Sequence, residues 1–172
     1  MLYYVKKASI EDLNRVMEVI YEGVEILKSA QIPQWQDENI PPREVLRQDI
    51  LNEDCFVLVE QTQIVGVAVL QKEPEDNYKT LDSGKWLHDS QNYHTIHRFT
   101  ISPNTKEKGL AKLFMSHLIS EAYRTGGRDI RIDTHQKNIV MQHIIAKFDF
   151  SECGTMTIPI RDGERLVYQL LL

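Results

Sequence analysis

The stretch from His97 to Ala111 constrains the fold of this chain most strongly. Up to Ile101 it has the residues of a strand, residues 102–108 form a polar turn, and Gly109 opens an apolar helical pattern. A strand that passes into a helix through a glycine turn leaves backbone N–H groups without partners at the positive end of the helix dipole. The sequence therefore predicts an anion site there, most often a phosphate site.

Composition narrows the class of protein. The 172 residues suit one domain, residues 1–172, and 42% hydrophobic with 26% charged residues is typical of globular chains. A net charge of −5 argues against a nucleic-acid partner. No apolar run approaches 18 residues, so we expect a cytoplasmic protein with no membrane partner. Cys55 and Cys153 lack metal-ligand spacing, and we expect free buried thiols and no metal.

Hydrophobic periodicity predicts a single α/β domain in the order βααβββαβαββ. We expect a mixed central sheet of about six to seven strands, with helices on both faces and a parallel crossover from residue 93 to 134. The strands are expected at residues 3–7, 55–60, 64–71, 93–101, 129–134, 153–158 and 166–171. Residues 72–92 form a long polar insertion, a kind of segment that is often functional. The acidic residues near position 75 are expected to be solvated.

This order and three local motifs resemble the GNAT superfamily of N-acetyltransferases over essentially the whole chain. The motifs are the strand triplet Phe99-Thr100-Ile101, the loop from Lys106 to Ala111, and the helix led by Asn138 that ends at Lys147-Phe148-Asp149-Phe150. Lys106 replaces the family's usual Arg or Gln, and Ala111 and Asp149 replace glycines. Aspartate tolerates the left-handed conformation better than most residues.

The resemblance implies acetyl-CoA as donor and an amine, in a small molecule or a peptide, as acceptor. It also implies that the strands at 93–101 and 129–134 splay apart around the pantetheine arm, while loop amides hold the pyrophosphate. The residues expected to bind the cofactor are Phe99, Thr100, Ile101, Lys106, Lys108, Gly109, Leu110, Ala111 and Asn138. The amide of Ile101 is a candidate oxyanion donor.

An aliphatic amine is neutral in only about one molecule in a thousand at pH 7, so the reaction needs a base. The candidates are Asp133, where some relatives carry a glutamate, and His97, with His94 and His135 at the ends of the same gap. Strand alternation puts His97 on one face with Tyr93, and His94 and Arg98 on the other. Asp133 could instead pair with Arg98 or Arg131, and His97 could be a core histidine. His135 is expected to be solvated.

Ile145 stands where many members carry the tyrosine that is commonly assigned to protonating the departing thiolate. Water, Tyr93 or His143 would then have to supply that proton. Direct attack in a ternary complex is favoured because neither cysteine lies in the expected gap. Trp35, Trp86 and Tyr93 are candidate acceptor contacts, although both tryptophans could be packing residues.

Two other functions stay open at this level. One is an acyl-CoA-binding module with little or no catalysis, which Ile145 favours. The other is a nucleotide-binding regulatory domain that uses the same turn for phosphates. The last two strands offer edges for a homodimer, and nothing in the sequence identifies the acceptor.

Overall fold

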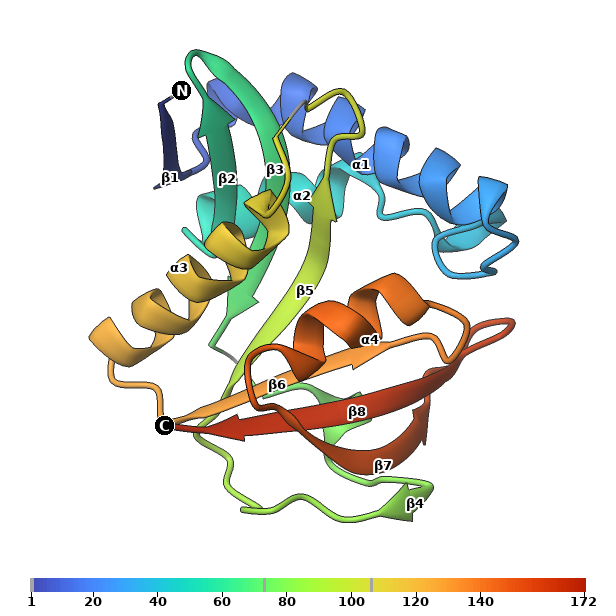
Figure 1. Ribbon diagram of the computed structural model, residues 1–172. Coiled ribbons are helices and arrows are strands. Elements are labelled where there is room, and N and C mark those ends of the chain that lie inside the picture. The colour runs from blue at the N-terminus through green and yellow to red at the C-terminus, as the bar shows by residue number, and fades with distance from the viewer. Residues whose placement is uncertain (1, 73, 106) are drawn as a thin grey trace.

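The computed structural model describes residues 2–72, 74–105 and 107–172, which form one mixed sheet with helices on both faces (Figure 1). The strand order in the sheet is β1-β2-β3-β5-β6-β8-β7-β4. The strands are β1 Tyr3–Lys7, β2 Cys55–Glu60, β3 Gln63–Gln71, β4 Ser83–Gly84, β5 His94–Ile101, β6 Asp129–Thr134, β7 Ser151–Thr157 and β8 Glu164–Leu171. The helices are α1 Leu13–Ser29, α2 Arg43–Leu51, α3 Leu110–Arg124 and α4 Ile139–Ala146.

Pairing of the strands is antiparallel except between β5 and β6, which are parallel and joined by α3. This confirms the expected strand–helix–strand unit. The parallel pairing covers only His94–Ile96 against Ile130–Ile132. Beyond these residues β5 continues along β3 while β6 follows β8, so the two strands separate (Figure 1).

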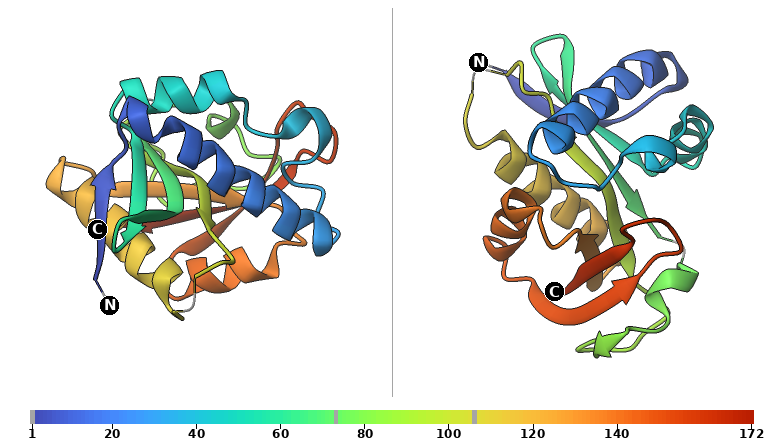
Figure 2. Two further views of the ribbon diagram at one scale, coloured as in Figure 1. Left: turned by 90° about the horizontal axis from the view of Figure 1, so that it is seen from above. Right: turned by 90° about the vertical axis from the view of Figure 1, so that its right-hand side faces the viewer.

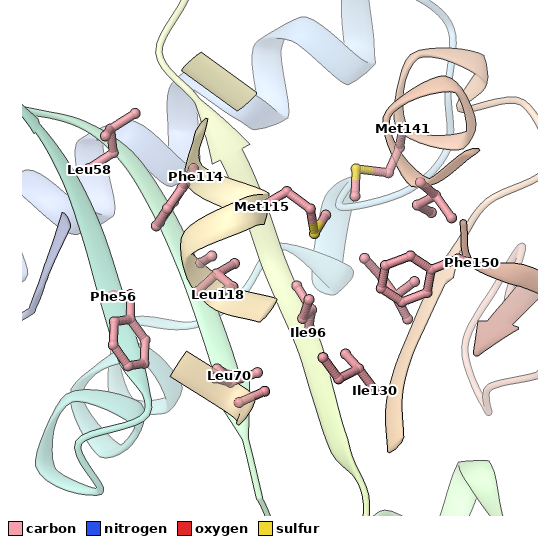
Figure 3. Packing of buried hydrophobic residues seen from close by; sticks show 14 of the residues in the cluster. Phe56, Leu58, Leu70, Ile96, Phe114, Met115, Leu118, Ile130, Met141 and Phe150 are labelled. Atoms are coloured by element: carbon pink, nitrogen blue, oxygen red, sulfur yellow. The ribbon is translucent and has the colours of Figure 1, made fainter. Parts of the chain in front are cut away.

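The helices form two layers around the sheet (Figure 2, left). The apolar stripe of α1, from Leu13 to Ile20, packs with α2 on one face of β2 and β3. Helices α3 and α4 cover the other face, where Phe114, Met115 and Met141 meet strand residues such as Ile96 and Ile130 (Figure 3). This second cluster spans β2 to β8 and ties the two halves of the sheet together.

The described part of the insertion, residues 74–92, packs over β7 and β8. A 3₁₀ turn at Asp76–Tyr78 and the two-residue strand β4 are its regular parts. Tyr78 and Trp86 pack with Met156 and Val167 in a third apolar cluster. The predicted fold class and element order are therefore confirmed. The structure adds β4, a two-residue strand that is too short to give an alternating hydrophobic pattern in the sequence.

Candidate active site

A cavity of about 560 Å³ lies where β5 and β6 separate. The ends of both strands form its floor, and Ala111 at the start of α3 and Asn138 before α4 lie on one side. The end of α1, the loop from α1 to α2, the insertion and the β7–β8 turn close the other side. Of the predicted site residues, the cavity brings together Trp35, His97, Phe99, Thr100, Ile101, Ala111, Asp133 and Asn138.

A bulge in β5 shapes the floor of this cavity. Arg98 has a positive φ of 52°, and the register against β3 shifts between Val67 and Val69. An extra residue bends a strand and changes the direction of its side chains. Arg98 therefore lies beside Asp49 of α2, with 3.3 Å between Nη1 and Oδ2. The expectation that Arg98 faces away from His97 is wrong because it assumed regular alternation.

Asp133 is held by two groups on the same face of the sheet. The hydroxyl of Tyr78 donates a hydrogen bond of 2.5 Å to Oδ1, and Nε of Arg165 lies 3.6 Å from Oδ2. Burial raises the pKa of Tyr78 well above 10, and the charges of Asp133 and Glu75 add to this effect. Burial also lowers the pKa of Arg165. The pairing of Asp133 with Arg98 or Arg131 is not found: these arginines pair with Asp49 and Asp129 instead.

His97 lies in the cavity with a carboxylate partner from the insertion. Its Nε2 makes a short hydrogen bond with Oε1 of Glu75, and its ring meets the ring of Tyr78 edge-on at 6.1 Å between centroids. Glu75 is therefore not solvated surface, contrary to the sequence prediction. Tyr78 contacts both candidate bases, because its hydroxyl reaches Asp133 while its ring packs against His97.

Glu75 and Tyr78 are functional candidates that the sequence did not reveal. Both lie in the insertion. Glu75 is 22 residues from its partner His97, and Tyr78 is 55 residues from its partner Asp133. The one available signal was their place in a long segment inside a compact domain.

Two expected acceptor contacts lie behind the cavity. Trp86 and Tyr93 are buried, and the guanidinium of Arg131 lies 4.2 Å and 3.9 Å from their ring centroids. The ring of Tyr78 stacks on that of Trp86 at 5.7 Å. Neither Trp86 nor Tyr93 lines the cavity. Both rings stack on the ring of Tyr78 and hold it in place.

The predicted phosphate loop has the expected backbone. Gly109 has φ of 87° and precedes the first turn of α3, whose leading N–H groups have no intrahelical acceptor. A β-carbon added to Gly109 would meet nothing within 4 Å, so the space beside it is open. Lys108 is exposed, Leu110 is buried in the core, and Lys106 lies outside the described residues.

The edge of β5 that faces β6 carries free backbone beyond Ile96. Among the described residues, β5 pairs with β6 only up to this position. Ser102 donates its amide to the carbonyl of Val65 on β3 at 2.7 Å. Since successive amides of a strand point to opposite edges, the amide of Ile101 points into the gap.

Asn138 connects α4 to the loop that follows α1. Its side chain caps α4 by accepting from the amide of Met141 at 3.1 Å and donates to Gln34 at 3.3 Å. Gln34 also accepts from the amide of His135 at 3.4 Å. His135 is buried and burial lowers its pKa, so the expectation of a solvated histidine is wrong.

The position where the resemblance would place a tyrosine carries a buried core residue. Ile145 is fully buried in the cluster under α4, and Ile144 lines the cavity in its place. His143 is exposed on α4, and neither His143 nor Tyr93 lines the cavity. Among the described cavity residues, Tyr78 is the one with a phenol group.

Comparison with known proteins agrees with this geometry. The pattern of the acetyltransferase (GNAT) family matches residues 20–150. The chain belongs to the GNAT acetyltransferase family. A search of curated proteins finds no match.

Solved GNAT structures share the fold over nearly the whole chain. A GNAT-family acetyltransferase from Streptococcus agalactiae 2603 is 33% identical with a TM-score of 0.90, and the match covers 99% of this chain and 95% of that one. One from Listeria monocytogenes 4b F2365 is 18% identical with a TM-score of 0.74, over 99% and 95%. No helix in the described part of the chain is long and apolar enough to cross a membrane.

Proposed function

We propose that this GNAT protein transfers the acetyl group of acetyl-CoA to an amine by direct attack within a ternary complex. The observation that carries the proposal is the shared cavity. It contains two carboxylate-centred pairs, Tyr78–Asp133 and His97–Glu75, next to the free edge of β5 that leads to the start of α3.

The donor side of the cavity fits a pantetheine arm and its phosphates. The gap along Phe99 and Ile101 offers backbone groups to the two amides of the arm, in the manner of an added strand. The first turn of α3 offers N–H groups and the positive end of the helix dipole to the pyrophosphate. Gly109 lets the phosphates approach closely because no side chain lies there.

In the proposed reaction, Asp133 accepts a proton from the acceptor ammonium, directly or through a water molecule. The amine nitrogen then forms a bond to the thioester carbon while the carbon–sulfur bond breaks. The amide of Ile101 donates to the carbonyl oxygen as it becomes negative. The nitrogen loses a second proton as the amide forms. Of the two protons that leave the nitrogen, one goes to the thiolate through the Asp133–Tyr78 pair and the other goes to solvent. His97 with Glu75 is the second candidate base.

Release of free CoA in the presence of acetyl-CoA and an amine panel tests the activity. We expect Asp133→Asn to lower kcat about 100-fold or more while the Kd for CoA stays within about twofold. His97→Ala should lower kcat by a smaller factor if Asp133 is the base. Asp162→Asn, an exposed carboxylate on the β7–β8 turn, is the matched control. Tight CoA binding without turnover across amines and peptides would support a binding module instead.

A further inference from the structure

The acceptor side of the cavity has two kinds of surface, an apolar wall and an acidic floor. The wall comes from the end of α1, the loop that follows it, the start of α2 and the β7–β8 turn. Its large side chains include Ile26, Trp35, Val45, Met156, Ile158 and Ile160. Ile26 and Ile160 are 43% and 37% exposed at the mouth, so apolar surface is available to a ligand.

Trp35 is held in place before any ligand binds. Its φ of 59° is unusual for a bulky side chain, so surrounding contacts must impose it. The side chain of Gln36 donates to the carbonyl of Val24 on α1, and that of Gln34 accepts from the amide of His135 just after β6. The ring lies over Gly23, where an added β-carbon would come within 3.3 Å of it. Trp35 therefore forms a rigid apolar wall close to the end of the strand that carries Asp133.

The pairing of the charged side chains around the floor favours a ligand with one positive charge. Asp49 pairs with Arg98, Asp133 pairs with Arg165, and Glu75 pairs with His97. Among the residues that the structure describes, Glu75 is therefore the one carboxylate of the three that has no guanidinium partner. A ligand with one ammonium group balances the charge of Glu75, whereas a ligand with two would carry one into an apolar wall.

An acidic group on the ligand would meet two arginines that already have carboxylate partners. Arg165 is almost fully buried and donates through Nη1 to the carbonyls of Asp162 and Glu164 at 2.8 Å and 2.9 Å. Arg98 lines the cavity, but its Nη1 is buried beside Asp49, 3.3 Å from Oδ2. Among the cavity-lining residues in the described ranges there is no lysine.

We propose that the acceptor is a primary monoamine with an aromatic or bulky aliphatic body and no acidic group next to the amine. The ammonium would lie at Asp133 and Glu75, and the body would pack on Trp35 and the apolar wall. This inference rests on the proposed acetyl transfer, and it specifies the substrate class for the same site.

Four matched amines test the substrate class: 2-phenylethylamine, L-phenylalaninamide, L-phenylalanine and putrescine. Values of kcat/KM are compared after correction for the unprotonated fraction of each amine. We expect the first two to exceed the last two by about 10-fold or more, because an unpaired buried charge is strongly rejected. Equal or higher values for phenylalanine or putrescine would overturn the proposal.

Calorimetric titration of 2-phenylethylamine into the CoA-saturated protein separates this inference from the proposed function. Binding without acetylation would mean that the substrate-class argument holds and the transferase proposal fails. Acetylation of putrescine or a peptide, with no binding of 2-phenylethylamine, would mean the reverse.

Two variants probe the wall itself. Trp35→Ala should reduce the preference for 2-phenylethylamine over propylamine about 10-fold, since the aromatic contact is lost. Tyr21→Ala, which removes an exposed aromatic ring of α1 outside this cavity, is the control and should leave the preference unchanged. Ile160→Arg, at an exposed turn, should raise kcat/KM for phenylalanine relative to 2-phenylethylamine by a similar factor. An unchanged preference in both folded variants would refute the assignment.

Discussion

The hydroxyl of Tyr78 donates a 2.5 Å hydrogen bond to Oδ1 of Asp133, although the two residues are 55 positions apart in the sequence. The stack of Tyr78 on Trp86, with Arg131 against the ring of Trp86, fixes the position of this phenol. The insertion therefore contributes directly to the candidate active site by orienting the carboxylate at the end of β6.

Tyr78→Phe removes only the hydroxyl and keeps the ring stack. We expect kcat/KM for amine acetylation to fall about 10-fold, because Asp133 loses the donor that orients it. The Kd for CoA should stay unchanged, since Tyr78 lies on the acceptor side. Steady-state kinetics together with CoA titration measure both quantities, and a parallel loss of CoA affinity would point to a general structural defect.

The same variant should alter the dependence of stability on alkaline pH. Burial raises the pKa of Tyr78 well above 10, so above pH 10 the unfolded chain releases a proton that the folded chain keeps. The free energy of unfolding then falls with pH by about 1.4 kcal/mol per pH unit for this group. Denaturant melts of wild type and Tyr78→Phe between pH 9 and 11 should therefore show a shallower decline in the variant. Equal slopes would mean that Tyr78 ionises as freely in the folded chain as in the unfolded one.

Glu75 and His97 should behave as one unit. We expect Glu75→Gln and His97→Asn each to lower kcat/KM. The double variant should have about the same kcat/KM as the less active single variant, because each change already breaks the shared hydrogen bond. Asp76→Asn is the control, since Asp76 is an exposed carboxylate that pairs with Lys79. Additive losses in kcat/KM would show that the two side chains act independently.

The glycines at the two ends of α3 allow backbone strain to be separated from ligand binding. Gly109 and Gly126 have φ of 87° and 92°, and an added β-carbon would touch nothing at either position. Replacement by alanine should cost about 1 kcal/mol of unfolding free energy at each site. Only Gly109→Ala should weaken CoA binding, because it alone lies at the N-terminal turn. If Gly126→Ala weakens CoA binding equally, the phosphate assignment is wrong.

Ile145→Tyr tests whether the family's missing tyrosine can be restored. Ile145 is fully buried among core side chains, so the larger ring should cost about 1–3 kcal/mol and should not raise kcat. Ile144→Tyr, at the neighbouring position that lines the cavity, should be better tolerated. Thermal melts and acetylation assays compare the two variants, and a rise in kcat for Ile145→Tyr would contradict the buried position.

Local patterns were sufficient to predict the turn at Gly109 and the cap at Asn138. These two features depend on residues within a few positions of one another, and both were found as expected. The positive φ of Asp149, 58°, also follows from a local requirement. Such features depend on the backbone of a single turn, which the sequence specifies directly.

The surroundings of His97 and Asp133 could not be predicted in this way. Glu75 and Tyr78 lie in a segment without periodicity, and only the packing of the insertion over β7 and β8 brings them to His97 and Asp133. The bulge at Arg98 was also hidden, because alternation along a strand presumes regular pairing with its neighbour. These features arise from tertiary contacts that no short stretch of sequence encodes.

The brief pairing of β5 with β6 has a consequence for the mechanics of the sheet. In the described part of the chain three residue pairs join its two halves at this junction, and the helix-side core and Tyr78 add further contacts between them. A ligand that lies in the gap adds contacts to both halves at once. Amide hydrogen exchange should therefore slow on β5 and β6 together when CoA is added, and the halves should then unfold as a single cooperative unit.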